Sequence, residues 1–255
     1  MILSADQVWN KLVKWPAKEA MRLVLGVERF GAFTFRRSPA LGRSWGGAMN
    51  GQRFRCLLVA ELIQKLAPLA IVETGTYLGM TTEWLASFQL PTFSCEAMQD
   101  NYGFAAARLA ATPNVHLVRR DSRSAIAAFL DGPLKQHLHE PMLFYLDAHW
   151  FDDLPLDDEV QMIFAECPQA IVLIDDFKVP GDSGYGYDDY GPGKSLDAAY
   201  LSQAIAQFNL AIRYPSVASS KETGAKRGCA VVTGPALELV VSRVELLAPV
   251  GRAGP

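Results

Sequence analysis

The sequence predicts an α/β fold with a mostly parallel sheet and helices on both faces. Short apolar runs rich in β-branched or aromatic residues alternate with helical stretches between residues 70 and 175. Such alternation is typical of βαβ crossovers in a parallel sheet. The chain has 255 residues, 50% of them hydrophobic and 20% charged, which suits an ordinary globular protein. We therefore expect one large α/β domain with additional helices, or one domain with a small appendage.

The region before the sheet is predicted to be a separate helical or cap segment, residues 1–52. A helix is expected over residues 4–25, because apolar residues such as Trp9, Leu12, Leu23 and Val24 repeat at helical spacing. Residues 26–51 are rich in glycine, arginine and aromatics and lack clear periodicity, so they are predicted to be a connector or cap. A second helix is expected over residues 53–66. The sheet domain then comprises residues 53–255.

The elements of the sheet follow in order. Strand-like runs begin near residues 70, 92, 115, 142 and 170, with helices expected over 81–88, 100–111, 124–135 and 157–166. A long segment rich in Gly, Pro, Tyr and Asp follows residue 176 and is predicted to be a lid or binding loop. Its tyrosines, Tyr185, Tyr187 and Tyr190, are candidates for stacking on a ring. A helix over 196–208 and a terminal hairpin of strands 210–215 and 228–233 complete seven strands.

Two of the buried strands end in carboxylates. The run over 142–146 leads into Asp147 and His149, and the run over 170–174 leads into Asp175 and Asp176. In an open parallel sheet, ligands bind outside the carboxyl ends of the strands. Clustered carboxylates repel one another unless a cation or a shared proton offsets the repulsion. The pattern favours metal-assisted or acid–base chemistry, although Asp175 or Asp176 could cap a turn and Asp147 could pair with an arginine such as Arg53.

The first three strands end in residues that suit a nucleoside cofactor. A turn with Gly75 and Gly79 follows the first strand, and its spacing differs from the GxGxxG pattern of dinucleotide-binding proteins. Glu96 ends the second strand, where an acid can accept hydrogen bonds from ribose hydroxyls. Asp121 and Ser122 follow the third strand, where a carboxylate and a hydroxyl can contact the edge of an adenine.

The motifs ETGTYLG, SCEA and RRDS resemble those of class I S-adenosylmethionine-dependent methyltransferases, over about residues 53–233. The resemblance implies a Rossmann-like seven-stranded, mostly parallel sheet with an antiparallel terminal strand, and S-adenosylmethionine as cofactor. It also implies that Glu96 binds the ribose and that Asp121 lies beside the adenine. The cofactor-binding residues expected on this basis are Glu73, Gly75, Thr76, Gly79, Glu96, Asp121 and Ser122.

The motifs LDAH and IDDF are most similar to a branch with macrocin- and novobiocin-type sugar O-methyltransferases and cephalosporin hydroxylase-like proteins. The resemblance implies that Asp147, Asp175 and Asp176 bind a divalent metal, usually Mg²⁺. His149 stands where some relatives carry an aspartate base. It could be the general base, an outer partner of the metal site or a satisfied core residue. We expect Asp147 and His149 to be the catalytic residues.

These observations predict a metal-assisted O-methyltransferase that acts on a hydroxyl of a small molecule such as a sugar or natural product. One alternative is a protein that binds S-adenosylmethionine without catalysis. Another is an NAD(P)-dependent oxidoreductase, which the missing GxGxxG pattern disfavours.

Bulk properties limit the partners and the location that we expect. The net charge of -3 suggests no nucleic-acid partner. No apolar run approaches the roughly 18 residues of a membrane span, and no signal peptide is visible. Four well-separated cysteines suit a reducing cytoplasm. The amphipathic N-terminal helix is compatible with a homodimer.

Overall fold

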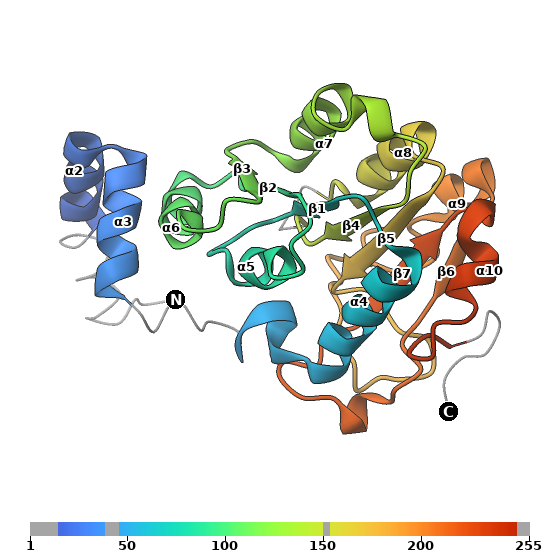
Figure 1. The fold of residues 1–255 in the computed structure, drawn as a ribbon. Helices are drawn as coiled ribbons and strands as arrows, with labels where there is room; N and C mark the ends of the chain where they lie inside the picture. The colour runs from blue at the N-terminus through green and yellow to red at the C-terminus, as the bar shows by residue number, and fades with distance from the viewer. Residues whose placement is uncertain (1–14, 39–45, 150–153, 249–255) are drawn as a thin grey trace.

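The structure, a computed structural model, describes residues 15–38, 46–149 and 154–248. Its centre is a seven-stranded sheet in the order β3-β2-β1-β4-β5-β7-β6 (Figure 1). Strands β1 to β5 are parallel, and β7 is antiparallel to β5 and β6. The predicted Rossmann-like sheet with its antiparallel terminal strand is thereby confirmed. The strands are β1 (Ile71–Thr74), β2 (Thr92–Cys95), β3 (Val115–Val118), β4 (Met142–Leu146), β5 (Ala170–Asp175), β6 (Ala211–Arg213) and β7 (Cys229–Thr233).

The strand order reverses beside β1, which lies between β2 and β4. In open α/β sheets such a reversal opens a crevice at the carboxyl ends of the two strands, because the following connections leave to opposite sides. The topology therefore directs attention to the residues that follow β1 and β4.

Helices cover both faces of the sheet (Figure 1). One apolar core lies between the sheet and α7, α8 and α9, and a second core contains side chains of α4, α5 and α10. Both cores bury β4 and β5 completely, which explains their continuous apolar sequences. The helices are α2 (Trp15–Leu25), α3 (Val27–Arg37), α4 (Arg53–Leu66), α5 (Met80–Ala86), α6 (Gln99–Leu109), α7 (Ser122–Asp131), α8 (Leu156–Glu166), α9 (Ser202–Phe208) and α10 (Glu238–Val241), with 3-10 turns η3 (Ala48–Gly51), η4 (Lys135–His137), η5 (Ser219–Lys221) and η6 (Pro235–Leu237).

Within residues 26–51, predicted as a connector or cap without clear periodicity, the structure contains a helix that the sequence pattern did not indicate. Residues 27–37 form α3, which packs closely on α6. A Cβ atom on Gly31 would lie only 2.0 Å from the carbonyl carbon of Gly103 in α6. The glycines that weakened the helical pattern therefore allow the two helix backbones to approach each other.

The predicted start of the helix over 196–208 was wrong, because α9 begins only at Ser202. The side chain of Asp197 accepts hydrogen bonds from the backbone N–H groups of Ala199 and Tyr200, at 3.0 and 3.2 Å. This local capping holds the preceding residues in turns rather than in a helix.

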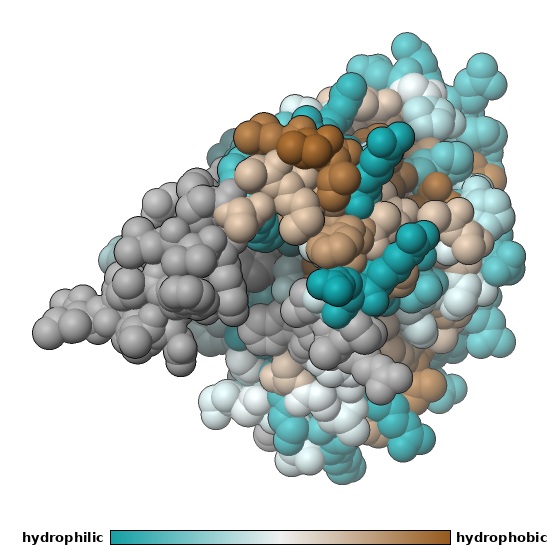
Figure 2. Space-filling view, turned by 90° about the vertical axis from the view of Figure 1, so that its left-hand side faces the viewer, coloured by the Kyte–Doolittle hydropathy of each residue, from teal (hydrophilic) through white to brown (hydrophobic). Residues whose placement is uncertain are grey.

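The described part of the predicted N-terminal helix is α2, and residues 4–14 of that prediction lie outside the described residues. Its polar side faces the domain, because Lys18 and Arg22 form ion pairs with Asp100 of α6. The apolar residues Leu23 and Val24 are 76% and 84% exposed. Figure 2 shows hydrophobic residues on the side of the molecule that carries α2 and α3.

No helix in the described part of the chain is long and apolar enough to cross a bilayer. The boundary at residue 52 stays a prediction. The turn η3 lies before residue 52 and contacts α4 and α5, which lie after it.

Candidate functional site

A cavity of about 360 Å³ lies at the carboxyl ends of β1, β4 and β5, at the reversal of the strand order. Backbone and side chains of the glycine turn form one wall, and carboxylates that follow β4 and β5 form another. The lining residues are Gly47, Asn50, Gly75, Thr76, Tyr77, Met80, Thr81, Tyr145, Asp147, Asp176, Asp188, Tyr190 and Arg227.

The glycine turn links the first wall to the second. Gly75 has a φ of +82°, and a Cβ atom on it would lie 2.3 Å from the carbonyl oxygen of Asp147. Only glycine allows this approach, so the turn after β1 touches the chain after β4. The backbone N–H groups of Gly75 and Thr76 donate to the carbonyl oxygen of Cys95, at 3.1 and 3.0 Å. Gly79 has a φ of +78° and precedes α5 as its N-cap.

Glu73 lies beneath this turn rather than along the cavity. Its side chain is completely buried, and one of its oxygens accepts hydrogen bonds from the hydroxyls of Thr82 and Ser94. Burial raises the pKa of Glu73 to about 7, although the two hydrogen bonds oppose that rise. These contacts connect β1 to α5, on the other side of the turn, and to β2.

Glu96 joins the turn to the end of β2. Its two carboxylate oxygens accept hydrogen bonds from the backbone N–H groups of Tyr77 and Met98, at 2.8 and 2.7 Å. Burial raises its pKa, and those hydrogen bonds moderate the rise. Asp121 is the N-cap of α7 and accepts from the N–H of Ser124 at 3.0 Å. Glu96, Asp121 and the buried Ser122 do not line the cavity.

Asp175 is held by donors from several elements. Oδ1 accepts from the guanidinium of Arg55 and from the N–H of Asp176, and Oδ2 accepts from the amide of Asn50 and the hydroxyl of Tyr145. Arg55 and Asp175 form an ion pair whose side chains are 1% and 0% exposed. The hydrogen-bonding capacity of this carboxylate is therefore filled by donors of the protein itself.

Asp147 and Asp176 line the cavity, and the buried His149 lies beside them. One potential ligand atom from each lies within 4.8 Å of the other two. Burial and the nearby carboxylates raise the pKa of Asp147 well above its usual range and that of Asp176 to about 7. Burial lowers the pKa of His149 to about 4. The structure thus brings together Asp147, Asp176 and His149, whereas the carboxylate of Asp175 is directed to Arg55.

Sequence reasoning missed Arg227 as a site residue. Its guanidinium forms ion pairs with Asp176 and with Asp188, and Asp188 also accepts a hydrogen bond from Tyr190 at 2.6 Å. Tyr190 belongs to the predicted binding loop and lines the cavity as expected for that loop. Arg227 precedes β7 and belongs to no recognisable sequence motif. It reaches the site only because β7 runs antiparallel beside β5.

Asn50 also lines the cavity, in a segment whose backbone is unusual. Met49 and Asn50 have φ values of +52° and +59°. The carbonyl of Asn50 accepts from the N–H of Ala225 at 3.0 Å, and Gln52 exchanges hydrogen bonds with the backbone of Arg227. Two adjacent left-handed residues other than glycine are costly, and such strain is concentrated at functional sites.

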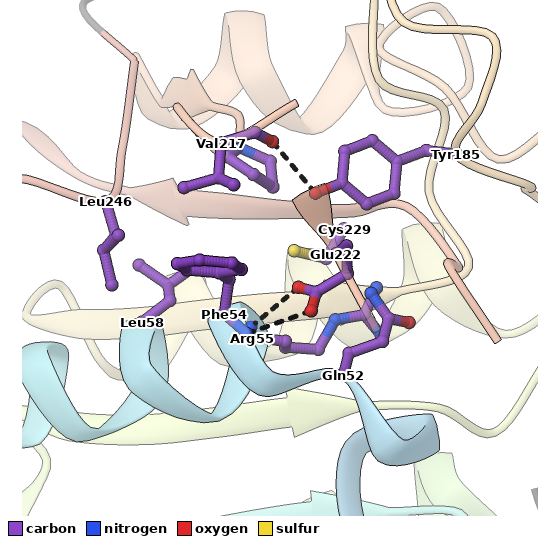
Figure 3. Close-up of a pocket in the computed structure, with 10 residues that line it drawn as sticks. Gln52, Phe54, Arg55, Leu58, Tyr185, Val217, Glu222, Cys229 and Leu246 are labelled. Atoms are coloured by element: carbon purple, nitrogen blue, oxygen red, sulfur yellow. Dashed lines mark hydrogen bonds between the residues drawn. The ribbon is translucent and has the colours of Figure 1, made fainter. Parts of the chain in front are cut away.

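A second, smaller pocket beside Arg55 is structural (Figure 3). Glu222 accepts hydrogen bonds from the N–H groups of Phe54 and Arg55, at 3.0 and 3.2 Å. Tyr185, a predicted stacking residue, is buried here and donates to the carbonyl of Val217 at 2.9 Å. Tyr187 instead lies under the ammonium of Lys178, 5.2 Å from the ring centre.

Comparison with known proteins supports the fold. No protein-family model matches the sequence, and no curated protein is significantly similar to it. A solved protein of Staphylococcus aureus, described provisionally as a caffeoyl-CoA O-methyltransferase, has a TM-score of 0.52 and 14% identity, over 79% of this chain and 92% of that one. The methyltransferase domain of bacterial CtHen1 has a TM-score of 0.49 and 11% identity, over 71% and 98%.

The chain also resembles WbdD, a bifunctional kinase-methyltransferase, with a TM-score of 0.45 and 15% identity. That match covers 71% of this chain and 40% of WbdD, so the chain spans well under half of the longer protein. The strand order and the likeness to the Staphylococcus aureus protein show a Rossmann-like fold of the kind found in methyltransferases.

Proposed function

We propose that the protein is an S-adenosylmethionine-dependent O-methyltransferase that is assisted by a divalent metal and acts on a hydroxyl of a small molecule. The observation that carries this proposal is the juxtaposition of two walls in one cavity. The glycine turn that begins at Gly75 lines one side of the cavity, and Asp147 and Asp176 line it from the ends of β4 and β5.

The residues of the cofactor side support S-adenosylmethionine. Gly75 and Thr76 line the cavity, and the turn is braced by Glu96 through the N–H of Tyr77. Glu96 is 7% exposed at the end of β2, where its remaining lone pairs can accept from ribose hydroxyls. Asp121, at the end of β3, is exposed and suits the adenine side.

The acidic wall supports a divalent metal. Asp147, Asp176 and Asp188 surround the cavity, and Arg227 is the cation among the lining residues. Asp175 is already neutralised by Arg55. A bound divalent cation would offset the remaining negative charge and lower the pKa of an acceptor hydroxyl.

The chain's own residues would orient the acceptor and receive its proton. Tyr190 and Asn50 offer hydrogen bonds across the cavity from the loop after β5 and from the segment before α4. Of the catalytic residues expected from the sequence, Asp147 lines the cavity and His149 lies buried beside it. Methyl transfer moves the methyl group from the sulfonium sulfur to the acceptor oxygen, and the hydroxyl proton leaves to a basic group at this site.

The proposal is tested by calorimetry with S-adenosylhomocysteine, the expected product. Glu96→Gln removes one carboxylate oxygen, so we expect it to weaken binding by roughly tenfold, because a hydrogen bond to a charged group contributes about 1.5 kcal/mol or more. Glu83→Gln, at an exposed position of α5, is the control and should bind like the wild type.

Three outcomes would change this conclusion. If the wild type does not bind S-adenosylhomocysteine, the methyltransferase assignment is wrong. Binding without methyl transfer to any acceptor in a broad panel of sugars and phenols would favour a non-catalytic binding protein. Binding of NADH in a fluorescence titration would favour an oxidoreductase.

A further inference from the structure

His149 is a buried side chain, 2% exposed, whose two ring nitrogens, Nδ1 and Nε2, find no hydrogen-bond partner among the described residues. Its backbone carbonyl lies 3.2 Å from the hydroxyl of Tyr190, whose proton is shared with Asp188 at 2.6 Å. A buried polar atom without a partner costs about 1–3 kcal/mol, which a bound ligand would recover.

The two carboxylates that are grouped with this ring, Asp147 and Asp176, also have free capacity. Asp147 accepts no side-chain hydrogen bond from the described residues, and Asp176 engages Arg227 through Oδ1. Their ligand atoms and a ring nitrogen of His149 lie within 4.8 Å of one another. When each metal–ligand distance is about 2.1 Å, neighbouring ligands of one ion are about 3.0–3.4 Å apart and opposite ligands about 4.2 Å apart. Small side-chain rotations would therefore bring all three onto one ion.

Asp175 does not fit this role. A carboxylate has about four lone-pair positions, and four donors already occupy those of Asp175. Releasing it to a metal would also leave the buried guanidinium of Arg55 without its counter-charge, which is costly. The third ligand must therefore come from another residue. His149 lies next to Asp147 and Asp176, and its ring nitrogens have no hydrogen-bond partner among the described residues.

We propose that Asp147, His149 and Asp176 form a binding site for a divalent first-row transition metal rather than for Mg²⁺. Mg²⁺ prefers oxygen ligands in near-ideal octahedral geometry. Imidazole favours later ions such as Fe²⁺, Co²⁺ and Zn²⁺, and two carboxylates with one imidazole suit these ions better than Mg²⁺. This inference rests on the metal-assisted site proposed above, but it does not require methyl transfer.

The test is calorimetric titration of the chelator-treated full-length protein with Co²⁺ and with Mg²⁺. We expect the wild type to bind Co²⁺ at least about tenfold more tightly than Mg²⁺. His149→Ala should weaken Co²⁺ binding by roughly 10- to 100-fold, by analogy with the loss of groups that support a metal site. His137→Ala, at an exposed histidine paired with Glu140, is the matched control and should leave Co²⁺ binding unchanged.

A measurement on the wild type avoids any folding defect of the variants. A histidine bound to Co²⁺ gives a solvent-exchangeable, hyperfine-shifted imidazole N–H resonance in the proton spectrum, and we expect this signal in the loaded wild type. The proposal is overturned if the signal is absent, if Mg²⁺ binds as tightly as Co²⁺, or if Co²⁺ binding is lost in Asp175→Asn but kept in His149→Ala.

Binding of S-adenosylhomocysteine to the same samples separates the two proposals. If the cofactor product binds and Co²⁺ does not, the metal assignment fails while the methyltransferase assignment stands. If Co²⁺ binds with the histidine signal and the cofactor product does not, the reverse holds.

Discussion

At the scale of single residues, the buried carboxyl group of Glu73 makes the free energy of unfolding depend on pH. The folded protein keeps a proton on Glu73 up to about pH 7, whereas the unfolded chain releases it near its ordinary pKa of 4.5. Between these values the folded state binds more protons than the unfolded state. Raising the pH through this interval therefore lowers the free energy of unfolding.

This difference predicts the behaviour of Glu73→Gln. The amide oxygen can still accept from Thr82 and Ser94, but it does not titrate. Between pH 5 and pH 8 the wild type should lose about 2–3 kcal/mol more of its unfolding free energy than the variant. Urea unfolding of both proteins at the two pH values measures this. Equal losses would show that Glu73 is not protonated in the folded state.

At the scale of elements, the crossing of α3 on α6 depends on two glycines. A Cβ atom on Gly103 would lie 2.4 Å from the carbonyl oxygen of Val27. We expect Gly103→Ala to separate the helices and to cost about 1–3 kcal/mol of the interaction that holds α3 in place.

Hydrogen exchange would locate this effect. Amides of α3 and α6 should exchange faster in Gly103→Ala, whereas amides of β4 and β5 serve as an internal control and should keep their protection. Unchanged exchange in α3 would contradict the close packing of these helices. Faster exchange throughout the sheet would mean that the N-terminal helices are part of the cooperative core.

At the scale of the whole molecule, Arg55 connects distant parts of the chain. It lies on α4, pairs with Asp175 at the end of β5 and donates to the backbone carbonyl of Arg227 before β7. Arg55→Met leaves the buried carboxylate without a cation and should cost about 3–5 kcal/mol of the unfolding free energy.

The double variant tests whether this cost comes from the uncompensated charge. Arg55→Met combined with Asp175→Asn should be less destabilised than Arg55→Met alone, because the remaining side chain at position 175 is neutral. Chemical denaturation of the wild type, both single variants and the double variant provides the comparison. Additive losses would show that the two residues do not act as a pair.

Most of the sheet could be predicted from the sequence because its signals are local. The buried strands β4 and β5 are continuous apolar runs, and helix α4 has the predicted bounds of 53–66. The errors arose where local signals were misleading. Glycine in α3 permits tight packing, and the capping by Asp197 delays α9.

The position of the candidate site could be predicted from the sequence, but the hydrogen-bond and ion-pair partners of its residues could not. The ends of β1, β4 and β5 could be recognised from carboxylates and glycines beside apolar runs, and the parallel topology brings those ends together. The partner of each carboxylate is set by side chains from remote segments. Arg55, Asn50 and Tyr145 satisfy Asp175, and this combination has no signature in the sequence.

By itself, the sequence determined the α/β class, the seven strands and the edge of the sheet where acids gather, because burial and periodicity act over neighbouring residues. Only the tertiary structure decided which of these carboxylates form ion pairs with arginines. It placed Arg55 against Asp175 and Arg227 between Asp176 and Asp188. Beside Asp147 it also buried the ring of His149, for which the described part of the chain supplies no hydrogen-bond partner. Charges interact through space, so the same three aspartates acquire different roles once distant cations have folded against some of them.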